Sequence, residues 1–297
     1  MNKNRKYGRF PNRGSGFRVQ RFKVDELVKS PKFRHAPAFA EAGSAKADIQ
    51  NYLKTQDSRF RENDVKGWVT KMEILENIPV EMNMAEIKRR LHISREQDLS
   101  LAQELVDTSQ ELFEAKAVFK VCYIDEKLEE AVKVDGLSFK SKVLRKNLDG
   151  VQRVFPYVVT IGPKFEAEMR NCPDLLKKYY LDIIGTLALS SARKQLEIHL
   201  QSKYALAKMS FMSPGSLADW PLEEQRPLFD LLGDAQNAIG VTLTDSLLML
   251  PAKSVSGIYF PAEITFFSCQ LCPRKECMGR KAAYSEKLAE EYGISEA

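Results

Sequence analysis

The sequence contains no long apolar run and no targeting segment. The nearest candidate for a membrane span, residues 181–192, is interrupted by Asp182 and Gly185 and falls short of the roughly 18 apolar residues that a spanning helix needs. No charged start followed by an apolar stretch indicates a signal peptide. We therefore expect a cytoplasmic protein without a membrane partner.

Motifs of several common enzyme classes are also absent. The sequence has no glycine-rich phosphate loop and no dinucleotide-binding fingerprint. Serine, histidine and aspartate occur without an arrangement typical of a hydrolase, and no internal repeat is visible. The sequence therefore indicates no catalytic residue, and whether the chain is an enzyme stays open at this point.

Acidic residues are scarce at the N-terminus. Residues 1–71 hold 17 Lys and Arg against 7 Asp and Glu, whereas the remainder holds 28 against 33. This segment also has scattered glycine and proline and little periodicity, so it cannot bury enough apolar area to offset its ordering entropy. We expect a disordered basic tail. It has no recognisable nucleic-acid-reading element, so a nucleic-acid partner is not expected.

A second observation concerns the same segment. Residues 51–64 resemble the conceptual translation of dispersed intergenic repeats found in bacterial genomes, and Met72 would be a natural start. Residues 1–71 are therefore expected to be a disordered or spurious extension, and residues 72–297 the functional domain.

Residues 72–297 show a mixture of helix and strand patterns. Capping residues and helical apolar spacing predict the helices, and alternation or buried runs predict the strands. The elements do not repeat in regular βαβ units, which favours one α+β domain. The predicted helices run from Asn83 to about His92, from Ser94 to about Glu114, from Ser141 to Leu148, from Pro163 onward and from Asp174 to about Tyr204, and the predicted strands cover 117–124, 132–139 and 152–161.

Three of the five cysteines lie close together near the C-terminus. Cys269, Cys272 and Cys277 fall within nine residues, inside a cysteine-rich segment that covers residues 266–281. In a reduced compartment such a cluster is typical of a metal site or a catalytic site, not of a disulfide framework. Neighbouring cations lower thiol pKa values and offset the charge of a thiolate centre. Those cations are Arg274, Lys275 and Arg280.

The identity of the metal stays open. An iron–sulfur centre prefers thiolate ligands, usually four, and zinc would need a fourth ligand from elsewhere. Cys122 and Cys172 are the only other thiols, and His199 is more typical of a helix surface or core than of a ligand. The third alternative is that the thiols are redox-active or unliganded.

Two segments further combine turn residues with small hydroxylated residues. Residues 212–225 read Met-Ser-Pro-Gly-Ser-Leu-Ala-Asp-Trp-Pro-Leu-Glu-Glu-Gln, and residues 239–260 contain Pro-Ala-Lys-Ser-Val-Ser-Gly-Ile-Tyr-Phe. Small residues between apolar elements let a backbone come close to a bound group, although ordinary tight turns have the same composition. Pro251 with the residues after it predicts a loop that leads into a short strand.

These segments resemble the activation domain of cobalamin-dependent methionine synthase. That family has a Pro-Gly turn, a helix ending in Leu-Phe-x-Leu-Leu-Gly (here Leu228 to Gly233), then Ile-Gly-Val-x-Leu-Thr, and then Pro-x-x-Ser-Val-Ser-Gly-x-Tyr-Phe (here Pro251 to Phe260). Order and spacing match over about 50 residues, with looser similarity back to about Met72.

The resemblance implies a fold and a function. The implied fold is a twisted, mainly antiparallel sheet surrounded by helices. The implied function is reductive remethylation of a corrinoid held by a partner protein or by the modules of a split methionine synthase, with S-adenosylmethionine (AdoMet) as a candidate methyl donor. The cofactor-binding residues that it implies are Pro214, Gly215, Ser216, Ser254, Ser256, Gly257 and Tyr259.

The chain departs from the family pattern in two ways. The family's Arg-x-x-Pro-Gly-Tyr holds AdoMet, but Phe211 and Ser216 occupy the Arg and Tyr places here, which leaves AdoMet binding open. The domain in methionine synthase needs no cysteine cluster, so the cluster indicates a stand-alone form through which an electron could pass. The alternative is a non-catalytic module that docks a corrinoid protein and whose cysteines hold a structural metal. The chain has no Asp-x-His-x-x-Gly cobalamin loop, so it is not a complete methionine synthase.

Overall fold

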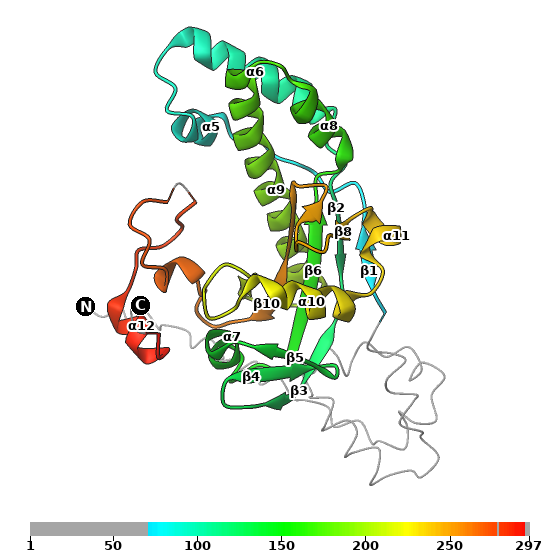
Figure 1. The fold of residues 1–297 in the computed structure, drawn as a ribbon, viewed down its shortest axis with the longest axis vertical. Coiled ribbons are helices and arrows are strands. Elements are labelled where there is room, and N and C mark those ends of the chain that lie inside the picture. The colour runs from blue at the N-terminus through cyan, green and yellow to red at the C-terminus, as the bar shows by residue number, and fades with distance from the viewer. Residues whose placement is uncertain (1–70, 278, 295–297) are drawn as a thin grey trace, which may run out of the picture. The chain divides into compact units, whose positions relative to one another are not determined.

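The computed structural model describes residues 71–277 and 279–294. The predicted N-terminal extension, residues 1–71, lies outside the described residues apart from Lys71. The described chain forms an antiparallel sheet with helices against it (Figure 1), which confirms the predicted α+β fold class. Within the described ranges no helix is both long and apolar enough to cross a membrane. The cytoplasmic location stays a prediction.

The centre of the sheet is β6 (Arg153–Thr160), which is buried along its whole length. Along one edge it pairs with β2 (Lys116–Phe119) and β3 (Cys122–Lys127), and along the other with β10 (Ser254–Pro261). Alternate side chains of a strand point to opposite faces, so a strand buried throughout has both faces covered. The strand predicted over residues 152–161 is confirmed.

The single strand predicted over residues 117–124 is wrong, because the chain breaks there into β2 and β3. The amide of Lys120 donates to the carbonyl of Pro156 on β6, at 3.1 Å. Proline has no N–H, so the reciprocal bond of this antiparallel pair cannot form. The hydrogen-bond ladder between this segment and β6 therefore lacks one bond at the point where β2 ends.

The strand predicted over residues 132–139 is also wrong, because it is a hairpin of β4 (Ala131–Val134) and β5 (Leu137–Lys140). Asp135 and Gly136 form the turn, with φ of 45° and 89°. Asp-Gly is a favoured pair for two-residue hairpin turns that need positive φ at both positions. β4 continues the sheet by pairing with β3.

The longest helix, α9 (Leu175–Lys203), packs its apolar row against one face of the sheet. Asp174 caps it by accepting from the amides of Leu176 and Lys177, as predicted. A Cβ built on Gly185 would lie 2.4 Å from the ring of Phe165 on α8 (Pro163–Asn171). The small residue therefore allows α8 to pack closely, and both predicted helices are confirmed.

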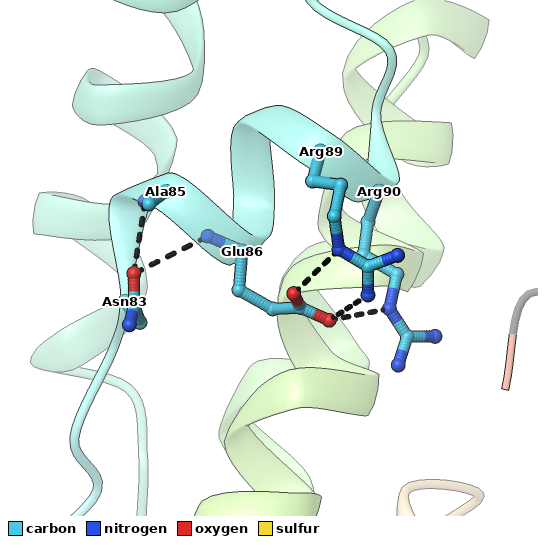
Figure 2. A network of polar contacts seen from close by, with 5 residues as sticks. All are labelled: Asn83, Ala85, Glu86, Arg89 and Arg90. Atoms are coloured by element: carbon cyan, nitrogen blue, oxygen red, sulfur yellow. Dashed lines mark hydrogen bonds and ion pairs between the residues drawn. The ribbon is translucent and has the colours of Figure 1, made fainter. Parts of the chain in front are cut away.

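Two further helices pack against α9 (Figure 1). Asn83 caps α5 (Met84–Arg90) by accepting from two backbone amides, and Glu86 pairs with Arg89 and Arg90 on the same helix (Figure 2). The helix predicted from Ser94 to Glu114 is shorter: α6 covers Glu96–Gln110, and no side chain caps its start.

The predicted helix from Ser141 is confirmed as α7 (Lys142–Asn147), with Ser141 as its cap. Asp219 reinforces this start from far along the chain. Its carboxylate accepts from the hydroxyl of Ser141 and, at 3.1 and 3.0 Å, from the amides of Lys142 and Val143. The Asp-Trp-Pro segment therefore locks a helix start in a part of the chain distant in sequence.

The remaining elements cover the other face and the C-terminal part. α10 (Gln225–Leu232) and α11 (Ala235–Ile239) pack on Val118 and Val158, on the side of the sheet away from α9. A separate apolar cluster joins Trp220 and the β4–β5 hairpin to the C-terminal segment. These elements, with the outer strand β1, are β1 (Glu73–Leu75), β7 (Met209–Met212), η2 (Leu222–Glu224), α10 (Gln225–Leu232), α11 (Ala235–Ile239), β8 (Thr242–Leu243), β9 (Met249–Leu250), η3 (Ser268–Gln270) and α12 (Glu286–Glu291).

Candidate functional site

The fold brings the two motif-bearing segments side by side. β7 pairs antiparallel with β10, so that Phe211 lies opposite Tyr259 and Met212 opposite Ile258. The Pro-Gly turn follows β7 directly. Residues 212–225 and 254–260 therefore belong to one region of the sheet, beside the cysteine-rich segment.

The Pro-Gly turn is the exposed part of this region. Gly215 has a φ of 78°, which favours glycine, and its amide donates to the carbonyl of Trp220 at 2.8 Å. Pro214 is buried, whereas Gly215 and Ser216 are exposed. The hydroxyl oxygen of Ser216 lies 3.4 Å from that of Ser268, which is next to Cys269. The turn thus lies against the cysteine-rich segment.

The predicted residues on β10 are buried instead. The hydroxyl of Ser254 donates to the carbonyl of Pro251 at 2.7 Å, and Ser256 is 2 % exposed. Gly257 and Tyr259 are buried between β6 and β7. The predicted residues of β10 are therefore part of the packed sheet. Of the predicted cofactor-binding residues, only Gly215 and Ser216 in the turn are exposed to solvent. Their cofactor-binding roles stay predictions.

A buried cation and three aromatic rings lie where α9 crosses β10 and β7. We refer to Tyr157, Arg193, Phe211, Tyr259 and Lys281 as the Arg193 cluster. Arg193 Nη1 donates to the hydroxyl of Tyr259 at 3.0 Å, and that hydroxyl donates to the Arg193 carbonyl at 3.1 Å. The guanidinium carbon lies 3.8 Å from the centre of the Phe211 ring, a cation–π contact. The cluster therefore ties the long helix to the strands that carry the motifs.

The two tyrosines of the cluster are kept neutral. Their ring centres are 4.6 Å apart, and burial raises the pKa of Tyr157 and that of Tyr259. Arg193 acts in the opposite direction on both pKa values but does not outweigh burial. At neutral pH both hydroxyls stay protonated, so neither is suited to act as a base.

Lys281 is the second cation of the cluster. Its ammonium nitrogen lies 5.5 Å from the centre of the Phe211 ring, and its backbone amide donates to Cys269 Sγ at 3.4 Å. Lys281 is an exposed residue, but desolvation of its ammonium group and, as the next cause, the positive charge of Arg193 together lower its pKa to about 8. The two cations therefore lie near enough to influence each other.

The cysteine-rich segment is fixed by its apolar residues and by one arginine. Phe266 and Leu271 are buried, and the amide of Phe266 donates to the hydroxyl of Ser210 at 2.8 Å. The Arg280 guanidinium donates to the carbonyls of Cys269, Cys272 and Ala282 at 3.1 to 3.2 Å. A guanidinium that binds several carbonyls holds an irregular backbone in place.

The thiols themselves are accessible but are not gathered around one point. Cys269 and Cys272 are half-buried and Cys277 is exposed. Among the residues that the structure describes, no group of three or more His, Cys, Asp or Glu side chains is placed to hold a metal ion. The other two thiols lie elsewhere: Cys122 is buried on β3, and Cys172 follows α8. The iron–sulfur, zinc and unliganded alternatives stay predictions.

Two surface hollows lie away from this region. One of about 520 Å³ is lined by residues 77, 78, 80, 110 and 113–116, and another of about 410 Å³ lies between α10 and the start of β8. Neither contains a residue that the sequence predicts for the site. These hollows therefore add nothing to the assignment.

Sequence reasoning missed the two cations of the Arg193 cluster. The sequence does indicate that Arg193 is unusual. It is a charged residue within the row of mainly apolar buried residues of α9, between Ala192 and Leu196. Charged residues are rarely buried without a partner. Lys281 carries no comparable signal, because its neighbours in the sequence are polar, small or charged.

Comparison with known families addresses this region directly. Residues 198–280 match the family described as vitamin B12 dependent methionine synthase, activation domain. Over these residues the chain is similar to that family. The match contains β7, the Pro-Gly turn, β10 and the cysteine-rich segment up to Arg280. The predicted family is confirmed, whereas the stand-alone form of the activation domain stays a prediction.

Curated proteins and solved structures give two further comparisons. No curated protein matches the chain. A crystal structure of the MetH reactivation domain bound to AdoHcy is similar to it with a TM-score of 0.47 and 12% sequence identity, covering 74% of this chain and 89% of that one. The likeness to the family lies in the matched residues 198–280.

Proposed function

We propose that this chain reactivates a corrinoid cofactor that is bound to a partner, either a separate corrinoid protein or the cobalamin-binding module of a methionine synthase. The observation that carries the proposal is the family match over residues 198–280. It contains the exposed Gly215–Ser216 turn and the strands that support it. This turn would face the corrinoid of the partner.

The chemistry needs one electron and one methyl group for each inactive corrinoid. AdoMet would supply the methyl group and leave as S-adenosylhomocysteine (AdoHcy), and an external one-electron donor would supply the electron. The residues of this chain would hold the reactants in position. The phenyl ring of Phe211 cannot bind the AdoMet carboxylate, but Arg193 and Lys281 lie beside it. Cations at this place fit the amino-acid end of AdoMet.

The alternative is a docking module that binds a corrinoid protein without transferring a methyl group. The absence of a guanidinium at position 211 favours it. A methylation assay separates the two: cob(II)alamin on its protein, with AdoMet and a chemical reductant, should yield methylcobalamin and AdoHcy only when this chain is added. Metal analysis of the same anaerobic preparation tests whether Cys269, Cys272 and Cys277 bind iron or zinc.

Binding to the corrinoid partner is the direct test. We expect a cob(II)alamin-loaded corrinoid protein to bind the full chain in an absorbance titration. A Ser216→Trp substitution at the exposed turn should weaken this binding, whereas Ser138→Trp, at an exposed position of β5, should not. Failure of the full chain to bind any corrinoid protein of its source would overturn the proposal.

A further inference from the structure

We propose that Cys269 and Cys272 form a redox-active dithiol, which closes reversibly to a disulfide by exchange with a low-molecular-weight disulfide such as oxidised glutathione. The two cysteines are separated by two residues in the sequence, and both are half-buried free thiols. In a reducing compartment such a pair is a reactive site and not a permanent disulfide framework. The inference goes beyond the proposed function and does not depend on it.

A tight turn brings the backbones of the two cysteines together. The amide of Cys272 donates to the carbonyl of Cys269 at 3.4 Å, and Leu271 between them has a φ of −107° and a ψ of 0°. This hydrogen bond and these angles are typical of a type I turn, in which the two outer Cα atoms lie less than about 7 Å apart. A disulfide needs Cα atoms about 4.4–6.8 Å apart. The turn therefore brings the pair into the range that a disulfide can bridge.

One guanidinium holds both cysteines in this arrangement. Arg280 donates through Nη1 to the carbonyl of Cys269 at 3.1 Å and through Nη2 to the carbonyl of Cys272 at 3.2 Å. Because the guanidinium is planar and rigid, it fixes the spacing of the two carbonyls that it binds. The amide of Lys281 also donates to Cys269 Sγ at 3.4 Å, which fixes the position of that sulfur. Arg280 is therefore a positioning residue for the pair.

The surroundings of the pair suit a small anionic reagent. The residues that follow Cys272, residues 273–277, are exposed, and they include the cations Arg274 and Lys275. Oxidised glutathione carries several carboxylates, so positive charge beside the thiols attracts it. Thiol–disulfide exchange also requires access to the attacking sulfur. An exposed, positively charged approach to two half-buried thiols meets both conditions.

The exchange takes place in two steps. The thiolate of one cysteine attacks oxidised glutathione, which releases one glutathione and leaves a mixed disulfide on the chain. The second cysteine attacks that mixed disulfide, forms the bond between Cys269 and Cys272 and releases the second glutathione. Each cysteine sulfur gives up one electron, and the two thiol protons pass to the two released glutathione molecules. The chain is therefore lighter by two hydrogen atoms, and excess reduced glutathione reverses the reaction.

The test follows the intact mass of the full chain after anaerobic equilibration with reduced and oxidised glutathione and an acid quench. The unaltered chain should lose two hydrogen atoms, and so should Cys277→Ser, which removes the exposed neighbouring thiol. Cys269→Ser and Cys272→Ser should each stop at the glutathione adduct. Peptide mapping should place the bond between Cys269 and Cys272. An unaltered chain that stops at the adduct, forms its disulfide through Cys277, or holds iron or zinc at these thiols and does not exchange would overturn the inference.

A second comparison tests the positioning by Arg280. The equilibrium constant for disulfide formation should be about tenfold or more higher in the native chain than in the same chain in urea, because unfolding removes the preset spacing of the thiols. Arg280→Gln should lower the native constant toward the value in urea. Lys275→Gln, which removes one charge from an exposed position of the same segment, should not. Equal constants for the native and the unfolded chain would overturn the inference, and an unchanged constant in Arg280→Gln would overturn the role of that residue.

Discussion

One glycine on β10 determines how closely this strand approaches the end of β7. A Cβ built on Gly257 would lie 2.5 Å from the carbonyl oxygen of Met212, 2.8 Å from Ser213 Oγ and 2.9 Å from the hydroxyl of Tyr157. The nearest of these atoms belongs to the backbone of β7. A methyl group therefore cannot be accommodated unless the two strands shift.

Gly257→Ala should lower the free energy of unfolding by about 1–3 kcal/mol, the usual cost of overpacking. Urea unfolding followed by circular dichroism measures this change. Gly150→Ala is the matched control, because a Cβ built on Gly150 meets nothing within 4 Å and the φ of Gly150 is not positive. This substitution should change the free energy of unfolding little. Equal stability of the two variants would contradict the close approach.

At the same scale, the sequence predicted part of the site. It identified the exposed turn at Gly215 and Ser216 and the strand that carries Tyr259. It did not show that Tyr259 is fully buried, because a motif reports which residues follow one another and not what packs on them. Arg193 and Phe211 come from separate elements, so their contact depends on the tertiary fold.

Among the elements, α5 holds its charged residues in a network that pH can test (Figure 2). Hydrogen bonds from Arg89, and then from Arg90, lower the pKa of Glu86 from its ordinary 4.5 to about 2. A carboxyl group whose pKa is lowered on folding stabilises the fold above its unfolded pKa. This stabilisation is lost as the pH falls from about 4.5 through about 2.

An NMR titration of the Glu86 side-chain carboxyl carbon should therefore give a pKa near 2. The double substitution Arg89→Gln with Arg90→Gln removes both donors and should return the pKa of Glu86 toward 4.5. An ordinary pKa of Glu86 in the unaltered chain would mean that the three side chains do not interact in solution.

Signals for helices and strands in this sequence differ in how reliable they are. Local side-chain caps at Asn83, Ser141 and Asp174 predicted helix starts correctly, because the cap and the amides that it binds are neighbours in the chain. The break between β2 and β3 depends on Pro156 of another strand, which residues 117–124 do not reveal. The Asp135-Gly136 turn was visible in the sequence, and reading residues 132–139 as continuous overlooked it.

At the scale of the whole molecule, the boundary of the functional domain is a proposal that truncation can test. Deleting residues 1–71 should leave the melting temperature nearly unchanged, because that segment is rich in charge and poor in apolar periodicity. Deleting residues 1–76 should lower the melting temperature by several degrees. That truncation also removes β1, which pairs with β2, and the contacts of Glu73 with Lys203 and Tyr204. An equal loss in both truncations would place the boundary earlier in the chain.

The guanidinium of Arg193 on the ring of Phe211 also has an evolutionary consequence. A charge on the long helix and a ring on a strand form one unit, so the fitness effect of replacing either residue depends on which residue occupies the other position. An arginine at position 211 would bring a second guanidinium against that of Arg193, so we expect a change at position 211 to be tolerated only with a change on the helix. A search for a contiguous Arg-x-x-Pro-Gly pattern would overlook every descendant that had made this exchange.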